Sequence, residues 1–194
     1  MSGILTRDDI IDGIREVIAR LRDAGGTATI QIVGGAAIAL TIDGDRPATV
    51  DVDGPISPLQ EVEAVAQRIA IERGWPLDWM NDKAKIFLPD GIGRSAEWVT
   101  LYDQDGILVQ AASPAMLLAM KLRAVERRGL RDIDDVAVLL AILGIDTADD
   151  AESVLNEFFP GDDLSPKTYD RVQALLDAGL PSVPRPSPPD FDFS

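Results

Sequence analysis

The chain has 194 residues, which suits one domain, or one domain with a helical extension. It contains no cysteine and no histidine, so disulfides, zinc–thiolate sites, thiol catalysis and imidazole bases are excluded. The net charge of −15 argues against a generally basic, nucleic-acid-binding surface and suits a basic protein partner, although Lys and Arg concentrate in residues 121–131. An enzyme of this composition has to use carboxylates, Lys, Arg and hydroxyl groups, which suits Mg²⁺-dependent phosphoryl transfer.

The N-terminal part predicts a helix and shows no targeting signal. Thr6 is the expected N-cap, apolar residues then recur at helical spacing, and Gly25-Gly26 end the pattern. The start of the chain turns acidic at once, and no run of about 18 apolar residues follows anywhere. We therefore expect no signal peptide, no membrane span and a cytoplasmic location.

Residues 30–53 form the stretch around which the chain is organised. An apolar run at 30–33 predicts a buried strand, and Gly34-Gly35 follow it directly, before a helix-compatible segment at 36–40. A strand that enters a helix through glycines presents free backbone N–H groups and the positive end of the helix dipole. This arrangement predicts a place to hold phosphate.

A second predicted strand, residues 49–53, carries two carboxylates. Side chains alternate along a strand, so Asp51 and Asp53 are expected on the same face. Two adjacent carboxylates repel each other unless a cation lies between them, and Mg²⁺ prefers such hard oxygen ligands. The alternative is a solvated acidic strand end after an ordinary turn.

The combined pattern resembles the signature of the polymerase-beta-like nucleotidyltransferase superfamily, in which Gly-Gly or Gly-Ser and a short helix precede Asp-x-Asp on the next strand. The matching residues are Gly34, Gly35, Asp51 and Asp53. With Arg46 and Thr49 included, the stretch is more narrowly similar to the AbiEii/MenT-type toxin nucleotidyltransferases. The resemblance implies that Arg46 braces the Asp loop or neutralises phosphate, and that the Thr49 hydroxyl faces the site, where its phosphorylation would silence the enzyme. For Thr49 the alternative is a plain strand-forming residue.

The middle of the chain predicts a helix after Ser57-Pro58 and a hairpin formed by residues 98–102 and 107–111. Trp75 and Trp79 could stack on a base or simply pack under a loop. Relatives of the resembled type often carry Trp-Leu-Asn-like residues here, which residues 79–81 match loosely. Many of them also place a third metal-binding carboxylate on a strand such as 107–111, where this chain has Gln110.

The C-terminal half is predicted to be helical, and Thr147 and Ser165 are the expected caps of its last two helices. Ser113-Pro114 begin a helix in which Lys121 lies on an apolar face, where a lysine either extends its amine to solvent or binds an anion. A second helix begins with acidic residues after residue 131, which capping alone could explain. The resemblance instead implies that Lys121 holds the nucleotide's phosphates and that Asp132 completes the site, with Asp135 and Arg131 as further candidates.

Together these features predict an α/β (α+β) fold: a small mixed sheet nucleotidyltransferase core at residues 1–112, a helical region at 113–180 and a Pro-rich tail at 181–194. The expected reaction is transfer of NMP from an NTP to a hydroxyl with Mg²⁺ or Mn²⁺ as cofactor. The resemblance implies the tRNA 3′ end as acceptor and a type IV-like toxin–antitoxin pair with a cognate antitoxin protein. The alternatives are a non-catalytic nucleotide- or partner-binding module on the same fold, and an enzyme that adds NMP to protein hydroxyls.

Overall fold

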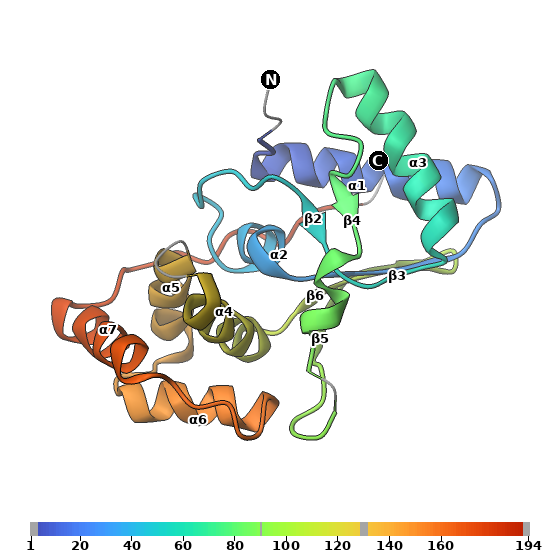
Figure 1. The fold of residues 1–194 in the computed structure, drawn as a ribbon. Coiled ribbons are helices and arrows are strands. Elements are labelled where there is room, and N and C mark those ends of the chain that lie inside the picture. The colour runs from blue at the N-terminus through green and yellow to red at the C-terminus, as the bar shows by residue number, and fades with distance from the viewer. Residues whose placement is uncertain (1–3, 90, 129–131, 192–194) are drawn as a thin grey trace. The chain divides into compact units, whose positions relative to one another are not determined.

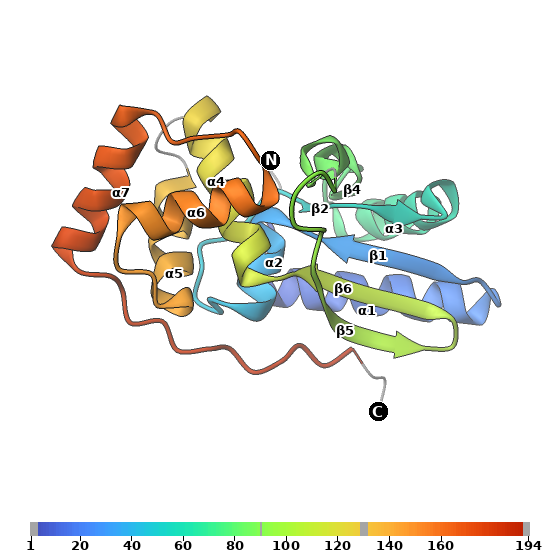
Figure 2. The same ribbon diagram turned by 90° about the horizontal axis from the view of Figure 1, so that it is seen from below.

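The computed structural model describes residues 4–89, 91–128 and 132–191 (Figures 1 and 2). Its contacts divide the chain into two compact units. The first contains the described residues of 1–86, 98–111 and 186–194, and the second those of 87–97 and 112–185. The predicted fold class is confirmed: a small mixed sheet with helices is followed by a helical C-terminal half.

The first unit is built on a four-stranded sheet of order β3-β1-β6-β5. Strand β1 (Ala28–Ile32) pairs in parallel with β6 (Ile107–Ala112) and antiparallel with β3 (Ile56–Ser57). Alternate side chains of β1 and β6 are buried, as expected for a sheet with one face against the core. The predicted hairpin is present: β5 (Trp98–Gln104) joins β6 through Asp105-Gly106, whose φ angles of 54° and 77° match the two-residue type I′ turn.

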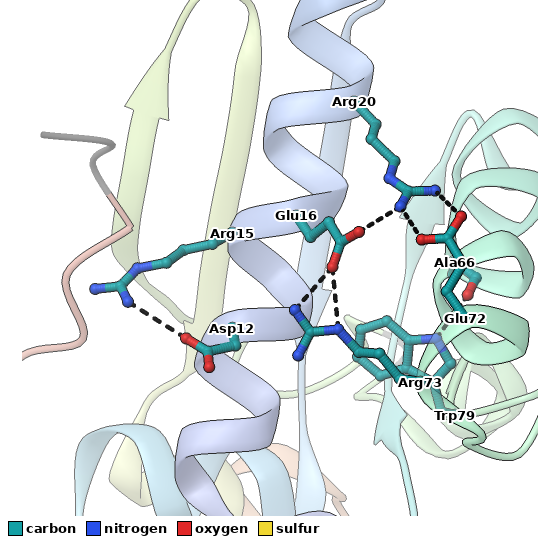
Figure 3. A network of polar contacts seen from close by, with 8 residues as sticks. All are labelled: Asp12, Arg15, Glu16, Arg20, Ala66, Glu72, Arg73 and Trp79. Atoms are coloured by element: carbon teal, nitrogen blue, oxygen red, sulfur yellow. Dashed lines mark hydrogen bonds and ion pairs between the residues drawn. The ribbon is translucent and has the colours of Figure 1, made fainter.

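Helix α1 (Arg7–Asp23) lies along one face of this sheet (Figures 1 and 2). Its N-terminus has the predicted Thr6 cap, which exchanges hydrogen bonds with Asp9. The charged side chains of α1 are not merely solvated. Glu16 accepts hydrogen bonds from Arg73 of α3 (Leu59–Arg73) and pairs with Arg20, which in turn pairs with Glu72 (Figure 3). This network joins the two helices side by side.

Trp79 is part of the core of the first unit. Its side chain is fully buried, and the indole N–H donates to the carbonyl oxygen of Ala66 at 2.9 Å (Figure 3). Helix α1 has a glycine opposite this ring, because a Cβ on Gly13 would lie only 2.6 Å from Trp79 Cη2. Trp75 meets Trp79 edge to face, with 5.1 Å between ring centroids. For Trp79, packing rather than base stacking is therefore the correct interpretation.

A second, two-stranded sheet pairs β2 (Val52–Asp53) in parallel with β4 (Met80–Asn81). The strand predicted at residues 49–53 is thus shorter than expected. Thr49 forms an antiparallel bridge with Leu5, which uses both of its backbone groups, at 2.6 and 3.0 Å, and the chain bends at Val50 before β2 begins. Strict alternation of side chains consequently does not extend from Thr49 to Asp53.

The Pro-rich tail is extended, and its last described part belongs to the first unit. Arg7 donates to the carbonyl oxygen of Ser187 at 2.7 Å and Arg15 to that of Asp190 at 2.5 Å. The ring of Phe191 is buried. Residues 186–191 therefore pack as a strap on α1, held through main-chain oxygens and one aromatic anchor.

The second unit consists mainly of helices α4 (Pro114–Arg128), α5 (Ile133–Leu143), α6 (Ala148–Phe158) and α7 (Pro166–Ala178). Three of them have the predicted caps: the hydroxyl groups of Ser113, Thr147 and Ser165 each accept a backbone N–H of the first turn. Among the described residues, no helix combines the length and apolar character that a membrane span requires.

Candidate functional site

The predicted strand–glycine–helix element is present in the first unit. Helix α2 (Gly34–Thr41) begins at Gly34, whose φ of +66° is a conformation that glycine adopts without strain. The N-cap residue Val33 contributes no side-chain cap, so the first-turn amides receive no acceptor from it. A Cβ on Gly35 would lie 2.8 Å from Arg46 Nη2, which shows that the guanidinium packs directly on the glycine backbone. The start of α2 therefore combines a helix dipole with a guanidinium, two features that attract an anion.

The carboxylate strand lies next to this helix start. The backbone N–H of Val33 donates to the carbonyl oxygen of Asp53 at 2.9 Å, in an isolated antiparallel bridge. Gly54 allows the chain after Asp53 to pass close to the backbone of β1, because a Cβ at residue 54 would lie 2.0 Å from the carbonyl oxygen of Gln31. Main-chain pairing thus fixes Asp53 beside the residue that precedes Gly34.

Both carboxylates are held by the end of β4 and the residues that follow it. The Asn81 amide donates to Asp51 Oδ2 at 3.2 Å, and the backbone N–H of Ala84 donates to Asp53 Oδ1 at 2.7 Å. Burial raises the pKa of Asp53 above its ordinary value, and the charge of Asp51 adds to this, while the Ala84 N–H opposes it. Lys83, on the same segment, pairs with Asp78 at 2.5 Å in an exposed position; this hydrogen bond, together with the charges of Asp51 and Asp53, raises the pKa of Lys83.

The pair has the chemistry of a magnesium site. Two carboxylates supply hard oxygen ligands, and Mg²⁺ commonly takes one or two carboxylates and completes its shell with waters and substrate phosphates. The raised pKa of Asp53 reflects the cost of burying its negative charge near that of Asp51, a cost that a cation would reduce. Among the described residues, however, no group of three or more Asp or Glu side chains is arranged to hold a metal ion. The donor set fits Mg²⁺ or Mn²⁺ as a two-carboxylate site.

The strand where a third carboxylate was considered carries a glutamine with a defined role. Gln110 of β6 accepts a hydrogen bond from Gln31 of β1 at 3.0 Å and donates to Thr100 of β5 at 3.3 Å. Its amide therefore links three neighbouring strands of the main sheet. The neighbouring Val109 is fully buried. Neither side chain supplies a metal ligand of the expected kind.

In the second unit, Lys121 of α4 meets the two aspartates that were predicted with it. Its Nζ lies 2.5 Å from Asp132 Oδ1 and 2.7 Å from Asp135 Oδ2. All three side chains are largely buried, with exposed fractions of 11–13%. Arg131 lies outside the described residues. The lysine therefore neither extends its amine to solvent nor offers a bare positive charge.

Two further arginines of α4 make contacts within the second unit. Arg123 pairs with Asp162 at 2.7 Å and covers the ring of Phe159, while Arg127 covers the ring of Phe87.

The predicted site residues are divided between the two units. The first contains Gly34, Gly35, Arg46, Thr49, Asp51 and Asp53, and the second Lys121, Asp132 and Asp135. Asn81 and Ala84 were not predicted as parts of the site. The loose match at residues 79–81 was the available signal for Asn81, whereas Ala84 acts through its backbone, which the sequence does not reveal.

No family model matches this sequence, and comparisons with curated proteins and with solved structures return no match either. Function is therefore inferred from the side chains themselves.

Proposed function

We propose that this protein is a Mg²⁺-dependent nucleotidyltransferase that moves NMP from an NTP to a hydroxyl group. The observation that carries this proposal is the pairing of Val33 with Asp53, at 2.9 Å between N and O. It sets a pair of carboxylates beside the glycine start of a helix. This adjacency supports the proposal, because carboxylates that could hold a metal would lie beside backbone amides that could receive phosphate.

The residues of the first unit have complementary roles in this reaction. Asp51 and Asp53 hold the metal, and the amides of Gly34 and Gly35, aided by Arg46, receive the triphosphate. A bound metal would offset the charge on the phosphates and stabilise the attacking and leaving oxygens. The acceptor hydroxyl oxygen forms a bond to the α-phosphorus and loses its proton. The bond between the α-phosphorus and the oxygen that bridges it to the β-phosphorus breaks, and pyrophosphate leaves.

The sequence resemblance gives Lys121 of the second unit the role of holding the nucleotide's phosphates. An ammonium group has three N–H donors, and the two aspartates account for two of them. Asp132 and Asp135 hold the ammonium in place and limit its net positive charge. In this role Lys121 is a directional hydrogen-bond donor rather than a centre of electrostatic attraction. The same resemblance gives Asp132 the role of a further ligand or of a residue that positions the acceptor hydroxyl.

For the acceptor we propose the 3′ end of a tRNA, with the protein acting as the toxin of a toxin–antitoxin pair, as the sequence resemblance implies. The net charge of −15 and the ion pair of Arg123 with Asp162 argue against a long electrostatic contact with RNA. A single terminal hydroxyl requires less basic surface than a duplex. The same charge suits a basic antitoxin.

The test is to incubate the purified chain with each α-labelled NTP, Mg²⁺, and either total RNA or total protein. Label that moves into RNA in the wild type, and does not in Asp53→Asn, supports the proposal. Label that moves into protein would make the chain a protein-modifying enzyme instead. Absence of both transfer and pyrophosphate release over all four NTPs would overturn it.

A non-catalytic binding module is the second candidate, and Gln110 favours it. The amide links Gln31 to Thr100 on the strand where many nucleotidyltransferases carry a third carboxylate. Calorimetry separates the two candidates. Mg²⁺-dependent NTP binding without pyrophosphate release would identify the binding module.

A further inference from the structure

We propose that Asn81 is a positioning residue that orients Asp51 for metal binding, an inference that rests on the proposed function of the carboxylate pair. Asn81 ends β4, the strand that pairs in parallel with β2, and it stands opposite Asp53 in the register. Its amide donates to Asp51 Oδ2 at 3.2 Å. The residue therefore touches one carboxylate through its side chain and pairs beside the other through its backbone.

Asn81 is buried, with an exposed fraction of 3%, and every polar atom of its side chain is used. Besides the bond to Asp51, Nδ2 donates to the carbonyl oxygen of Asp78 at 3.1 Å, and Oδ1 accepts the backbone N–H of Lys83 at 3.0 Å. The contacts on both sides of the amide fix its rotamer. A buried amide with all its partners in place is a rigid donor, and here that donor is aimed at Asp51.

The segment from Asn81 to Ala84 holds one oxygen of each carboxylate. Asn81 binds Asp51 Oδ2, and the backbone N–H of Ala84 binds Asp53 Oδ1. Each carboxylate thereby has one oxygen held by a donor from this segment, which limits its rotation. Partners of this kind around metal ligands set the ligand orientation, and their loss typically lowers metal affinity by about 10–100-fold.

The inference can be tested with Mn²⁺, which suits the same oxygen ligands and is detected directly by electron paramagnetic resonance. The full-length chain is compared with Asn81→Ala and Asn81→Ser. Serine keeps a polar atom near the Lys83 N–H but ends one atom short of the Asp51 contact. Trp79→Phe serves as the matched control. Trp79 lies two residues before Asn81, and its substitution removes a buried hydrogen bond to Ala66 without removing a bond to either carboxylate.

We expect both Asn81 variants to bind Mn²⁺ at least tenfold more weakly than the wild type, and Trp79→Phe to bind it equally well. Wild-type affinity in a folded Asn81→Ala or Asn81→Ser protein would overturn the positioning role while leaving the proposed function in place. A wild type that binds no Mn²⁺ would overturn the metal site itself. If neither Asn81 variant folds, Asn81 supports the fold rather than the metal and the inference fails.

Discussion

The ammonium nitrogen of Lys121 lies 2.5 Å from Oδ1 of Asp132, and both side chains are close to nine-tenths buried. Asp135 approaches the same nitrogen at 2.7 Å. One positive and two negative charges are thus buried close together. The lysine offsets the negative charge of the aspartates, and the aspartates hold the lysine ammonium in position. Burying charges is tolerable only while such partners remain in place.

Lys121→Met should therefore destabilise the fold as well as impair activity. Removal of the cation leaves two buried carboxylates without their partner, which typically costs about 3–5 kcal/mol of unfolding free energy. Chemical denaturation measures this directly. The exposed Lys167 of α7 provides the control, since Lys167→Met should change stability by less than about 0.5 kcal/mol.

A combined variant separates charge from packing at this cluster. In the Lys121→Met background, Asp132→Asn and Asp135→Asn together should restore part of the lost stability, because they remove the uncompensated charges. No recovery in the triple variant would show that uncompensated charge is not the cause of the lost stability. Catalytic efficiency, corrected for the folded fraction, should still fall by about thirtyfold in Lys121→Met if one phosphate contact worth ~2 kcal/mol is lost.

Asp53→Asn should abolish transfer and yet stabilise the metal-free protein at neutral pH. Burial and the charge of Asp51 raise the pKa of Asp53, which means that its ionised form carries a cost in the folded state. Asparagine removes the charge and keeps an oxygen for the Ala84 N–H. Thermal melts with and without Mg²⁺ test both parts: we expect a higher melting temperature without metal and no gain when metal is added. A lower melting temperature without metal would contradict the electrostatic account.

Asp51→Asn should likewise abolish transfer without loss of the fold.

Gly54→Ala should be severely destabilising, by about 4 kcal/mol or more. Gly54 has a φ of 148°, and a Cβ there would meet the carbonyl oxygen of Gln31 at 2.0 Å, a backbone atom that cannot move aside. Gly74→Ala is the control, because Gly74 has a φ of 68° but open space around it, so only the left-handed backbone penalty of about 1–2 kcal/mol applies. Equal losses in urea denaturation would mean that the main-chain crossing next to Asp53 is not tight.

Glu126→Gln should lower stability at neutral pH and have no effect in strong acid. Partial burial alone would raise the pKa of Glu126, but hydrogen bonds from Thr168 and Ser165 outweigh it and hold the pKa below the ordinary value of 4.5. A carboxylate whose pKa is lower in the folded protein stabilises the fold at pH values above its unfolded-state pKa. This contribution is lost as the pH falls through the folded-state pKa. The side chain is exposed, so the difference from wild type should stay below about 1 kcal/mol near pH 7 and vanish only in strong acid, once the pH lies below the lowered folded-state pKa of Glu126. A difference that persists at low pH would assign the loss to packing.

Local rules were sufficient to predict much of the fold. Thr6, Ser113, Thr147 and Ser165 cap helices as expected, because a hydroxyl that accepts a first-turn N–H needs only its own neighbours. The hairpin at Asp105-Gly106 is equally local. The glycine start of α2 was also predicted, because the apolar strand, the two glycines and the helix-compatible segment follow one another directly in the sequence.

Features that depend on distant partners could not be predicted in this way. The strand at 49–53 was expected to be regular, but pairing with Leu5, 44 positions earlier, ends the regular geometry at Thr49. The ion pairs of Lys121 required knowledge of where α5 packs. The contact of Ala84 with Asp53 could not be predicted from residue types, because the donor is the backbone N–H of Ala84.

The last prediction concerns Thr49, whose hydroxyl was expected to share a face with the two carboxylates. The bend at Val50 removes the alternation on which that expectation depended, so its position has to be tested by charge. Thr49→Glu keeps both backbone bonds to Leu5 and should remain folded. If the side chain points toward the carboxylate pair, the new negative charge repels the triphosphate and competes for the metal, and transfer is lost, whereas Thr49→Ser keeps most activity.

Val50→Glu is the matched control for Thr49→Glu. Val50 is 47% exposed, so the same charge placed one residue further along meets solvent. Transfer rates of the three variants, compared under one set of Mg²⁺ and NTP concentrations, decide between two cases. Loss in Thr49→Glu with activity retained in Val50→Glu places the hydroxyl at the site. Equal loss in both would reduce the effect to overall charge near Asp51, and wild-type activity in Thr49→Glu would show that the hydroxyl faces away from the nucleotide.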